Sequence, residues 1–92
     1  MLAVIIKGVM VSLNIYLLTT DGCHLCEFAK ALCAEVGISP ELIDIVEDDQ
    51  LVEVYGDKIP VLMVAQAEQA LFWPFEKEQI EQYLEVYGIN SN

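Results

Sequence analysis

The stretch Thr19-Thr20-Asp21-Gly22-Cys23-His24-Leu25-Cys26, at residues 19–26, decides the fold. Before it, residues 14–18 form the β-branched and aliphatic run Asn-Ile-Tyr-Leu-Leu, which predicts a buried strand that runs into a turn. After it, apolar residues recur at helical spacing until Gly37, a residue typical of the left-handed position that ends a helix. The predicted apolar face of this helix consists of Leu25, Phe28, Ala29, Leu32 and Val36. The stretch is therefore the turn from a strand into a helix, with Cys23 at the start of the helix.

The rest of the chain continues this alternation of strands and helices. The second predicted strand is parallel to the first, because a helix lies between them. Asp48 is a typical capping residue for a short helix, and Pro74 prevents the fourth strand from pairing further. A hairpin turn over residues 65–69 makes the third and fourth strands antiparallel. The predicted segments are, in order, the strand 14–18, the helix 23–36, the strand 41–46, the helix 49–55, the strand 61–64, the strand 70–73 and the helix 75–87, which Gly88 ends.

Length and charge limit the classes of function. A chain of 92 residues, 55% of them hydrophobic, suffices for one compact α/β domain that spans residues 1–92. Its 15 Asp and Glu residues face four Lys and no Arg, which gives a formal net charge of -11. Because such an acidic surface repels phosphate backbones and anionic lipids, we expect no nucleic-acid partner and no membrane partner.

The first 18 residues are apolar enough to raise the question of a signal peptide or a membrane span, but Lys7, Ser12 and Asn14 interrupt them. A spanning helix needs about 20 consecutive apolar residues, and no small-residue cleavage pattern follows. We therefore expect a cytoplasmic protein. Met10 stands just before the first strand, which suggests that residues 1–9 are an extension from an upstream start.

The two cysteines of Cys23-His24-Leu25-Cys26 carry the candidate chemistry. Residues three apart lie on one face of a helix about one turn apart, so the two thiols can form a disulfide. The free N–H groups and the positive dipole at a helix start stabilise an anion, and they lower the pKa of a thiol there from about 8.5 to roughly 3.5–7.5. Cys23 is therefore the predicted nucleophile. Cys26 faces the sheet and is the predicted resolving cysteine, which attacks the mixed disulfide from inside.

His24 and Cys33 are the other two residues near the pair that could take part in its chemistry. A Cys-x-x-Cys pair also forms half of a zinc site, but only His24 and Cys33 remain as further ligands, where spaced pairs are usual. Cys33 lies about two turns beyond Cys26 on the same helix, which is too far for a disulfide, and is predicted to pack in the core. His24 either adds positive charge beside the thiolate or faces the solvent.

Several motifs match a known family. They are Cys23-His24-Leu25-Cys26, Ile45 to Asp48, Tyr55-Gly56, Lys58-Ile59-Pro60-Val61-Leu62 and Trp73-Pro74-Phe75. With the order of elements, they resemble the thioredoxin-like superfamily, and within it the small bacterial glutaredoxin-like proteins that were first grouped as a domain of unknown function. This resemblance implies a four-stranded mixed sheet in the order 2-1-3-4 with helices on both faces. It also implies that Pro60 is cis beside the dithiol, where the backbone of Ile59 would bind an extended substrate.

The chain departs from true glutaredoxins at positions that bind glutathione in that family. His24 replaces a proline, Lys58-Ile59-Pro60 replaces Thr-Val-Pro, and Trp73-Pro74-Phe75-Glu76 replaces Gly-Gly-x-x-Asp. We expect no resident cofactor, and the substrate is either a disulfide-bearing protein or a glutathione mixed disulfide. The candidate substrate-binding residues are His24, Lys58, Ile59 and Pro60. Trp73 and Phe75 are predicted to pack the last helix on the sheet, with a substrate-facing Trp73 as the alternative.

The leading hypothesis is an enzyme, a monomeric glutaredoxin-like thiol–disulfide oxidoreductase. In this hypothesis Cys23 attacks a disulfide, Cys26 releases the product, and an external thiol reductant resets the pair. Two alternatives stay open. Two chains could share an iron–sulfur cluster or a zinc ion through their cysteines, or the domain could be a thioredoxin-like adaptor in which the dithiol is incidental.

Overall fold

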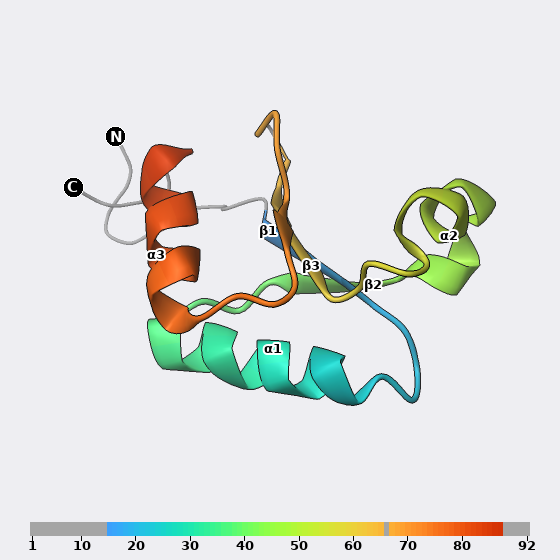
Figure 1. Cartoon of the computed structure of the whole chain (residues 1–92), viewed down its shortest axis with the longest axis horizontal. Coiled ribbons are helices and arrows are strands. Elements are labelled where there is room, and N and C mark those ends of the chain that lie inside the picture. Colours follow the sequence, from blue (N-terminus) through green and yellow to red (C-terminus); the bar gives the residue numbers. More distant parts are fainter. Residues whose placement is uncertain (1–14, 66, 88–92) are drawn as a thin grey trace.

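The computed structural model describes residues 15–65 and 67–87. The elements are, in chain order, β1 (Ile15–Thr19), α1 (His24–Val36), β2 (Glu41–Asp44), the 3-10 helix η1 (Ile45–Glu47), α2 (Asp49–Tyr55), β3 (Val61–Val64), β4 (Leu71–Phe72) and α3 (Lys77–Val86) (Figure 1). This is the predicted order of strands and helices. Asn14, the proposed extension at residues 1–9 and the predicted stop at Gly88 lie outside the described residues.

The four strands form one mixed sheet in the order β2-β1-β3-β4. β1 is parallel to β2, with Leu17 opposite Leu42, and antiparallel to β3, with Leu17 also opposite Leu62. β3 and β4 are antiparallel, and Val61 lies opposite Phe72. The predicted strand order 2-1-3-4 and the predicted strand directions are therefore confirmed.

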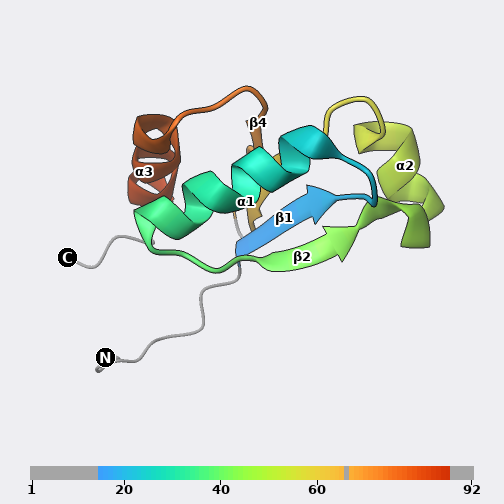
Figure 2. The same ribbon diagram turned by 90° about the horizontal axis from the view of Figure 1, so that it is seen from below.

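The helices lie on both faces of the sheet, as predicted. Alternate residues of β1 and β3 point to one face, where Leu17 and Leu62 pack against residues of α1 and α3. Figure 2 shows α1 running across the sheet with α3 beside its C-terminal end, and α2 at the other end of the molecule. Leu18 and Val61 point to the opposite face, where they form a smaller cluster with Ile45 that α2 covers. The sheet is thus the middle layer of three.

The buried face of α1 agrees with the prediction except at two residues, and Leu32 and Val36 pack against the core as predicted. Its buried residues are Cys26, Ala29 and Cys33, which follow one another at helical spacing. Leu25 and Phe28, predicted to belong to the apolar face, are 44% and 60% exposed. The apolar arc of α1 is wider than the strip that the sheet can cover, and the small cysteine and alanine side chains occupy the centre of contact. The two large residues are therefore left at its margin, near the start of the helix.

The boundaries of several elements also differ from the prediction, most of all those of β2, β4 and α3. β2 ends at Asp44, because the Asp44 side chain accepts a hydrogen bond from the Val46 N–H at 3.2 Å and starts η1. β4 is reduced to Leu71–Phe72, so residues 70 and 73 are outside it. α3 begins at Lys77 rather than Phe75, because Glu76 and Gln79 form a capping box in which the Glu76 N–H donates to Gln79 Oε1 at 2.6 Å. Phe75 instead inserts into the core, where it is 2% exposed.

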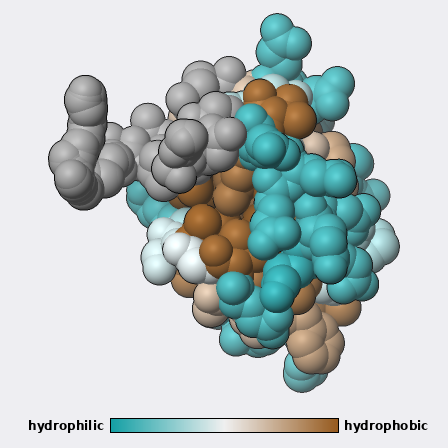
Figure 3. Space-filling view, turned by 90° about the vertical axis from the view of Figure 1, so that its left-hand side faces the viewer, coloured by the Kyte–Doolittle hydropathy of each residue, from teal (hydrophilic) through white to brown (hydrophobic). Residues whose placement is uncertain are grey.

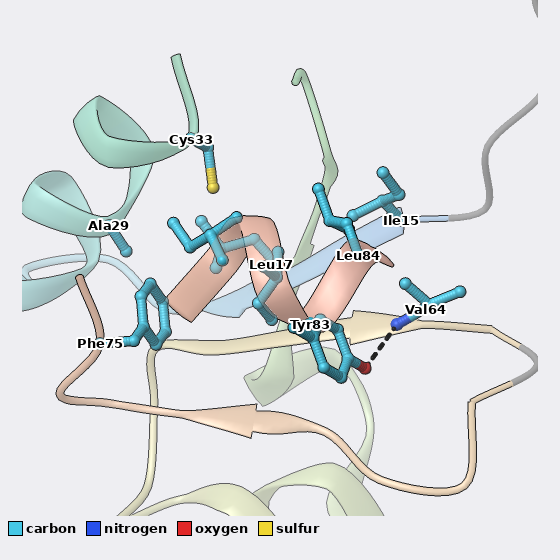
Figure 4. Packing of buried hydrophobic residues seen from close by; sticks show 10 residues of the cluster. Ile15, Leu17, Ala29, Cys33, Val64, Phe75, Tyr83 and Leu84 are labelled. Carbon is cyan, nitrogen blue, oxygen red and sulfur yellow. Dashed lines mark hydrogen bonds between the residues drawn. The ribbon is translucent and has the colours of Figure 1, made fainter. Parts of the chain in front are cut away.

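A buried tyrosine hydroxyl ties α3 to the sheet. Tyr83 Oη accepts a hydrogen bond from the Val64 N–H at 3.1 Å and donates one to the Gln69 carbonyl oxygen at 2.7 Å. Figure 4 shows the Val64 bond beside the packed core, with the Cys33 sulfur directed toward the same cluster. Burial raises the pKa of Tyr83, so the hydroxyl keeps its proton and can make both bonds. The end of β3, the turn that follows it and α3 therefore form one rigid unit.

We expect Tyr83→Phe to lower the free energy of unfolding by about 1–3 kcal/mol, because it leaves the buried Val64 N–H and Gln69 carbonyl without their partner. Urea denaturation at neutral pH measures the change. Tyr55→Phe is the matched control, because no hydrogen bond joins the Tyr55 hydroxyl to a described residue. Removal of this hydroxyl should lower the free energy of unfolding by less than about 0.5 kcal/mol. Equal effects of the two substitutions would show that the Tyr83 hydroxyl contributes nothing.

Candidate functional site

The turn between β1 and α1 places Cys23 at the N-cap of the helix. Gly22 has φ +79°, a left-handed conformation that glycine adopts without steric cost. Cys23 has extended backbone angles (φ -92°, ψ 104°), and its Sγ accepts a hydrogen bond from the Cys26 N–H at 3.1 Å. The predicted position is thus corrected by one residue, since α1 begins at His24 and Cys23 caps it. The sulfur lies where unpaired helical N–H groups favour negative charge.

Cys23 and Cys26 are joined in a disulfide, with their Cα atoms 5.2 Å apart. The two cysteines differ in exposure. Cys26 is 1% exposed and belongs to the buried face of α1, whereas Cys23 is partly exposed. Cys23 is therefore the residue of the pair that an external molecule can approach, whereas Cys26 is enclosed. This is the asymmetry predicted for an attacking and a resolving cysteine.

A groove of about 340 Å³ adjoins the first turn of α1. Three segments that are far apart in the sequence build it: the start of α1, the loop between α2 and β3, and the end of β4. Its lining residues are Leu25, Asp57, Lys58, Ile59, Phe72 and Trp73. The structure therefore brings Lys58 and Ile59 beside the Cys23–Cys26 turn. Leu25, Asp57 and Phe72 are additions to the predicted site. The apolar arc of α1 is a sequence signal for Leu25, whereas no sequence signal marks Asp57 or Phe72.

The loop before β3 carries the other candidate residues. The Ile59–Pro60 peptide bond is cis, and a second cis bond joins Trp73 to Pro74. Pro60 is buried. The Ile59 N–H donates to the Tyr55 carbonyl oxygen at 3.2 Å, which leaves the Ile59 carbonyl as the group that an extended substrate could contact. Pro60 supplies no N–H, so this backbone offers an acceptor and no donor.

The charged residues around the groove are largely paired with one another. Lys58 Nζ lies 3.3 Å from Asp57 Oδ1, and Lys30 Nζ lies 3.0 Å from Glu27 Oε2. Both pairs are exposed, and such pairs contribute little to stability. His24 is exposed at the first position of α1 and does not line the groove. The structure therefore favours the solvent-facing interpretation of His24.

Comparison with known proteins places this site in a family. The sequence profile of the Glutaredoxin-like domain (DUF836) matches residues 14–85, well over half of the chain. The chain belongs to this glutaredoxin-like family. With the Cys23–Cys26 pair at disulfide distance, family membership supports a redox role for the domain.

Solved structures agree with this assignment. The X-ray structure of protein XcR50 from X. campestris is 29% identical, with a TM-score of 0.71 over 78% of this chain and 96% of that chain. The solution structure of the same protein gives 28% identity and a TM-score of 0.71 over 79% and 94% of the two chains. Protein Ne2328 from Nitrosomonas europaea, at 23% identity and a TM-score of 0.60 over 84% and 98%, shares the fold. No curated protein matches the chain.

Two aromatic residues connect the groove of this glutaredoxin-like domain to its core. Phe75 packs among the buried residues between α3 and the sheet, as predicted. Trp73 contacts Phe75 edge to face, with ring centroids 5.0 Å apart, and at the same time lines the groove. The predicted core packing of Trp73 is therefore confirmed, while its substrate-facing alternative stays a prediction. The groove wall is fixed by a contact with the core.

The rest of the glutaredoxin-like domain was compared with the known kinds of metal site, ligand groove and membrane span. Within residues 15–65 and 67–87, no group of three or more His, Cys, Asp or Glu side chains is placed to hold a metal ion. A second groove, of about 360 Å³, lies along α3 and is lined mainly by glutamine, tyrosine and aliphatic side chains. Figure 3 views this side and shows hydrophobic residues bordered by hydrophilic ones. None of the described helices is long and apolar enough to cross a bilayer.

Cys33 is separate from the redox pair, as predicted. It is 1% exposed and packs in the cluster beneath α1 and α3. Burial raises the pKa of its thiol to about 11. At neutral pH the Cys33 thiol is therefore protonated, and neither the attacking nor the metal-binding form of a cysteine is present there.

The raised pKa of Cys33 predicts a loss of stability at alkaline pH. Above the ordinary thiol pKa of 9.0 the unfolded chain releases the proton, while the folded domain retains it up to about 11. The free energy of unfolding should therefore fall as the pH rises through this window, by about 1.4 kcal/mol at pH 10 from this group. Urea denaturation of the disulfide form at pH 7 and pH 10 measures it. Cys33→Ala should show a correspondingly smaller fall, and an identical pH dependence in both proteins would contradict the assignment.

Proposed function

We propose that this glutaredoxin-like domain is a thiol–disulfide oxidoreductase that reduces disulfides of other molecules through Cys23 and Cys26. The observation that carries the proposal is the difference in exposure between the two cysteines at one helix terminus. A reactive sulfur at the surface and a second sulfur buried one turn away are what two sequential exchange steps require.

In the first step, the Cys23 thiolate of the reduced domain attacks one sulfur of the substrate disulfide. A bond forms between Cys23 Sγ and that sulfur, and the other substrate sulfur leaves as a thiolate, which takes a proton from solvent. The Cys26 N–H, which donates to Cys23 Sγ at 3.1 Å in the disulfide form, is positioned to stabilise the thiolate before attack. The product is a mixed disulfide with Cys23.

In the second step, Cys26 loses its proton and attacks Cys23 Sγ, which releases the substrate as a free thiol. The Cα atoms of Cys23 and Cys26 are 5.2 Å apart, within the range of about 4.4–6.8 Å found in disulfides. The disulfide can therefore form without movement of the backbone in the first turn of α1. In total, two electrons pass from the dithiol to the substrate disulfide, and two protons follow. An external thiol reductant then supplies two electrons to restore the Cys23–Cys26 dithiol.

We expect Cys26→Ser to stop the reaction after the first step. The variant should accumulate a covalent mixed disulfide with its substrate, because Cys23 can still attack but nothing can resolve the product. Mass spectrometry after alkylation of free thiols detects the adduct. Cys23→Ser is the matched control and should trap nothing, because Cys26 is buried. Trapping through Cys26 in this control would contradict the assigned roles.

We also expect a reversible two-electron couple in the folded domain. Titration against thiol–disulfide buffers, followed by alkylation and counting of free thiols, should show two thiols lost together in one transition, with Cys33 free throughout. Cys33→Ala should give the same transition. If Cys23 and Cys26 do not form a bond at any potential, the enzyme hypothesis fails, and the cluster-sharing module and the adaptor remain.

A further inference from the structure

The groove beside Cys23 presents apolar side chains to solvent. Leu25 is 44% exposed and Phe72 is 45% exposed, and Trp73 lies between them and the core. Phe28, one turn further along α1, is 60% exposed. Large apolar side chains that gather next to a reactive group on a small domain typically mark an interaction surface. This one begins at Leu25, which stands between the two cysteines in sequence.

The size of the groove indicates what part of a ligand it can hold. Its volume of about 340 Å³ is at the lower end of the range of ligand sites, roughly 300–1,000 Å³. That space fits one bulky side chain with its backbone, while the rest of the ligand stays on the open surface. The Ile59 N–H is already bonded to the Tyr55 carbonyl oxygen, so the group that Ile59 can offer to a ligand is its own carbonyl oxygen, an acceptor. A peptide N–H next to the inserted side chain can donate to that carbonyl.

The charge around the groove favours a neutral or basic ligand. The lysine in its lining, Lys58, is paired with its neighbour Asp57, and Lys30 on α1 is paired with Glu27. Asp57 in the lining is exposed, and so is Asp21, which stands two residues before Cys23. The whole chain carries a formal net charge of -11. A ligand with two carboxylates, such as glutathione, would meet this field and would compete with Asp57 for Lys58.

We infer that the groove of Leu25, Lys58, Ile59, Phe72 and Trp73 docks a bulky apolar residue adjacent to the substrate cysteine, and that the domain prefers protein disulfides on neutral or basic surfaces over glutathione mixed disulfides. The inference rests on the proposed function, because it concerns the substrate of that same dithiol. The apolar wall supplies affinity by removing surface from water. The acidic surroundings raise the association rate of a basic partner and lower that of an anionic one.

The test compares substrates that differ in one property each. The reduced domain is given four mixed disulfides of 2-mercaptoethanol, which is the shared leaving thiol. Its partners are a peptide with Phe beside the cysteine and two flanking Lys residues, the same peptide with Ser in place of Phe, the same peptide with Glu in place of both Lys residues, and glutathione. Hydroxyethyl disulfide, small and neutral, serves as a fifth substrate that needs no groove. The measured quantity is the second-order rate constant for the release of thiol in a single turnover of the reduced domain.

We expect the Phe and Lys peptide to react roughly tenfold faster than the Ser peptide and roughly tenfold faster than the Glu peptide at low salt. The advantage over the Glu peptide should shrink as salt is added, and the glutathione mixed disulfide should be slower than the first peptide. Phe72→Ala should abolish most of the preference for Phe over Ser, because it removes one wall of the groove without altering the residues between the cysteines. Leu42→Ala is the matched control, since Leu42 is 50% exposed on β2, at the sheet edge opposite β4, and should leave the preference unchanged.

The remaining outcomes separate this inference from the proposed function. Reduction of hydroxyethyl disulfide with no preference among the peptides, or with glutathione mixed disulfide as the fastest substrate, would overturn the docking inference and leave the oxidoreductase intact. An unchanged Phe preference in Phe72→Ala would also overturn it. Failure to reduce any of the five disulfides would overturn both.

Discussion

The packing of α1 on the sheet fixes the geometry on which the site depends. Cys26, Ala29 and Cys33 form the strip of α1 that contacts the sheet, and all three are at most 1% exposed. Cys26 is held in that strip, and the turn at Gly22 ends the helix three residues earlier, so Cys23 lies at the terminus beyond the buried contact. Cys23 therefore caps the helix and remains partly exposed. The exposure difference between the two sulfurs follows from where the helix meets the sheet, and small side chains at the contact allow that close approach.

The same packing explains why a strongly acidic chain carries an apolar surface at this point. The apolar arc of α1 extends past the buried strip, so Leu25 and Phe28 face solvent near the disulfide. The end of β4 completes the surface with Phe72, which also contacts the ring of Tyr55 with centroids 6.4 Å apart. Apolar side chains therefore stand beside the Cys23–Cys26 pair on a chain whose formal net charge is -11.

Several contacts keep the groove wall in place. The Trp73 ring packs on Phe75, and Phe75 is buried between α3 and the sheet. Tyr83 bonds α3 to the end of β3 and to the turn that leads into β4. The position of β4 relative to α1 is therefore set by α3, an element that does not itself line the groove. Core residues on α3 act on the site only by positioning its wall.

The sequence by itself determined the order of elements, the strand-to-helix turn at residues 19–26 and, through a family resemblance, the strand order. Helical spacing also placed Cys23 at the start of α1, Cys26 on its buried face and Cys33 in the core. These features depend on local spacing and on turn residues, which are written along the chain. Only the tertiary structure decided that Leu25 and Phe28 stay outside the buried face of α1, because that depends on how much of a broad apolar arc the sheet can cover. It also assembled Leu25, Lys58 and Phe72 into one groove, since residues that are far apart in sequence become neighbours only when strands pair and helices pack across them.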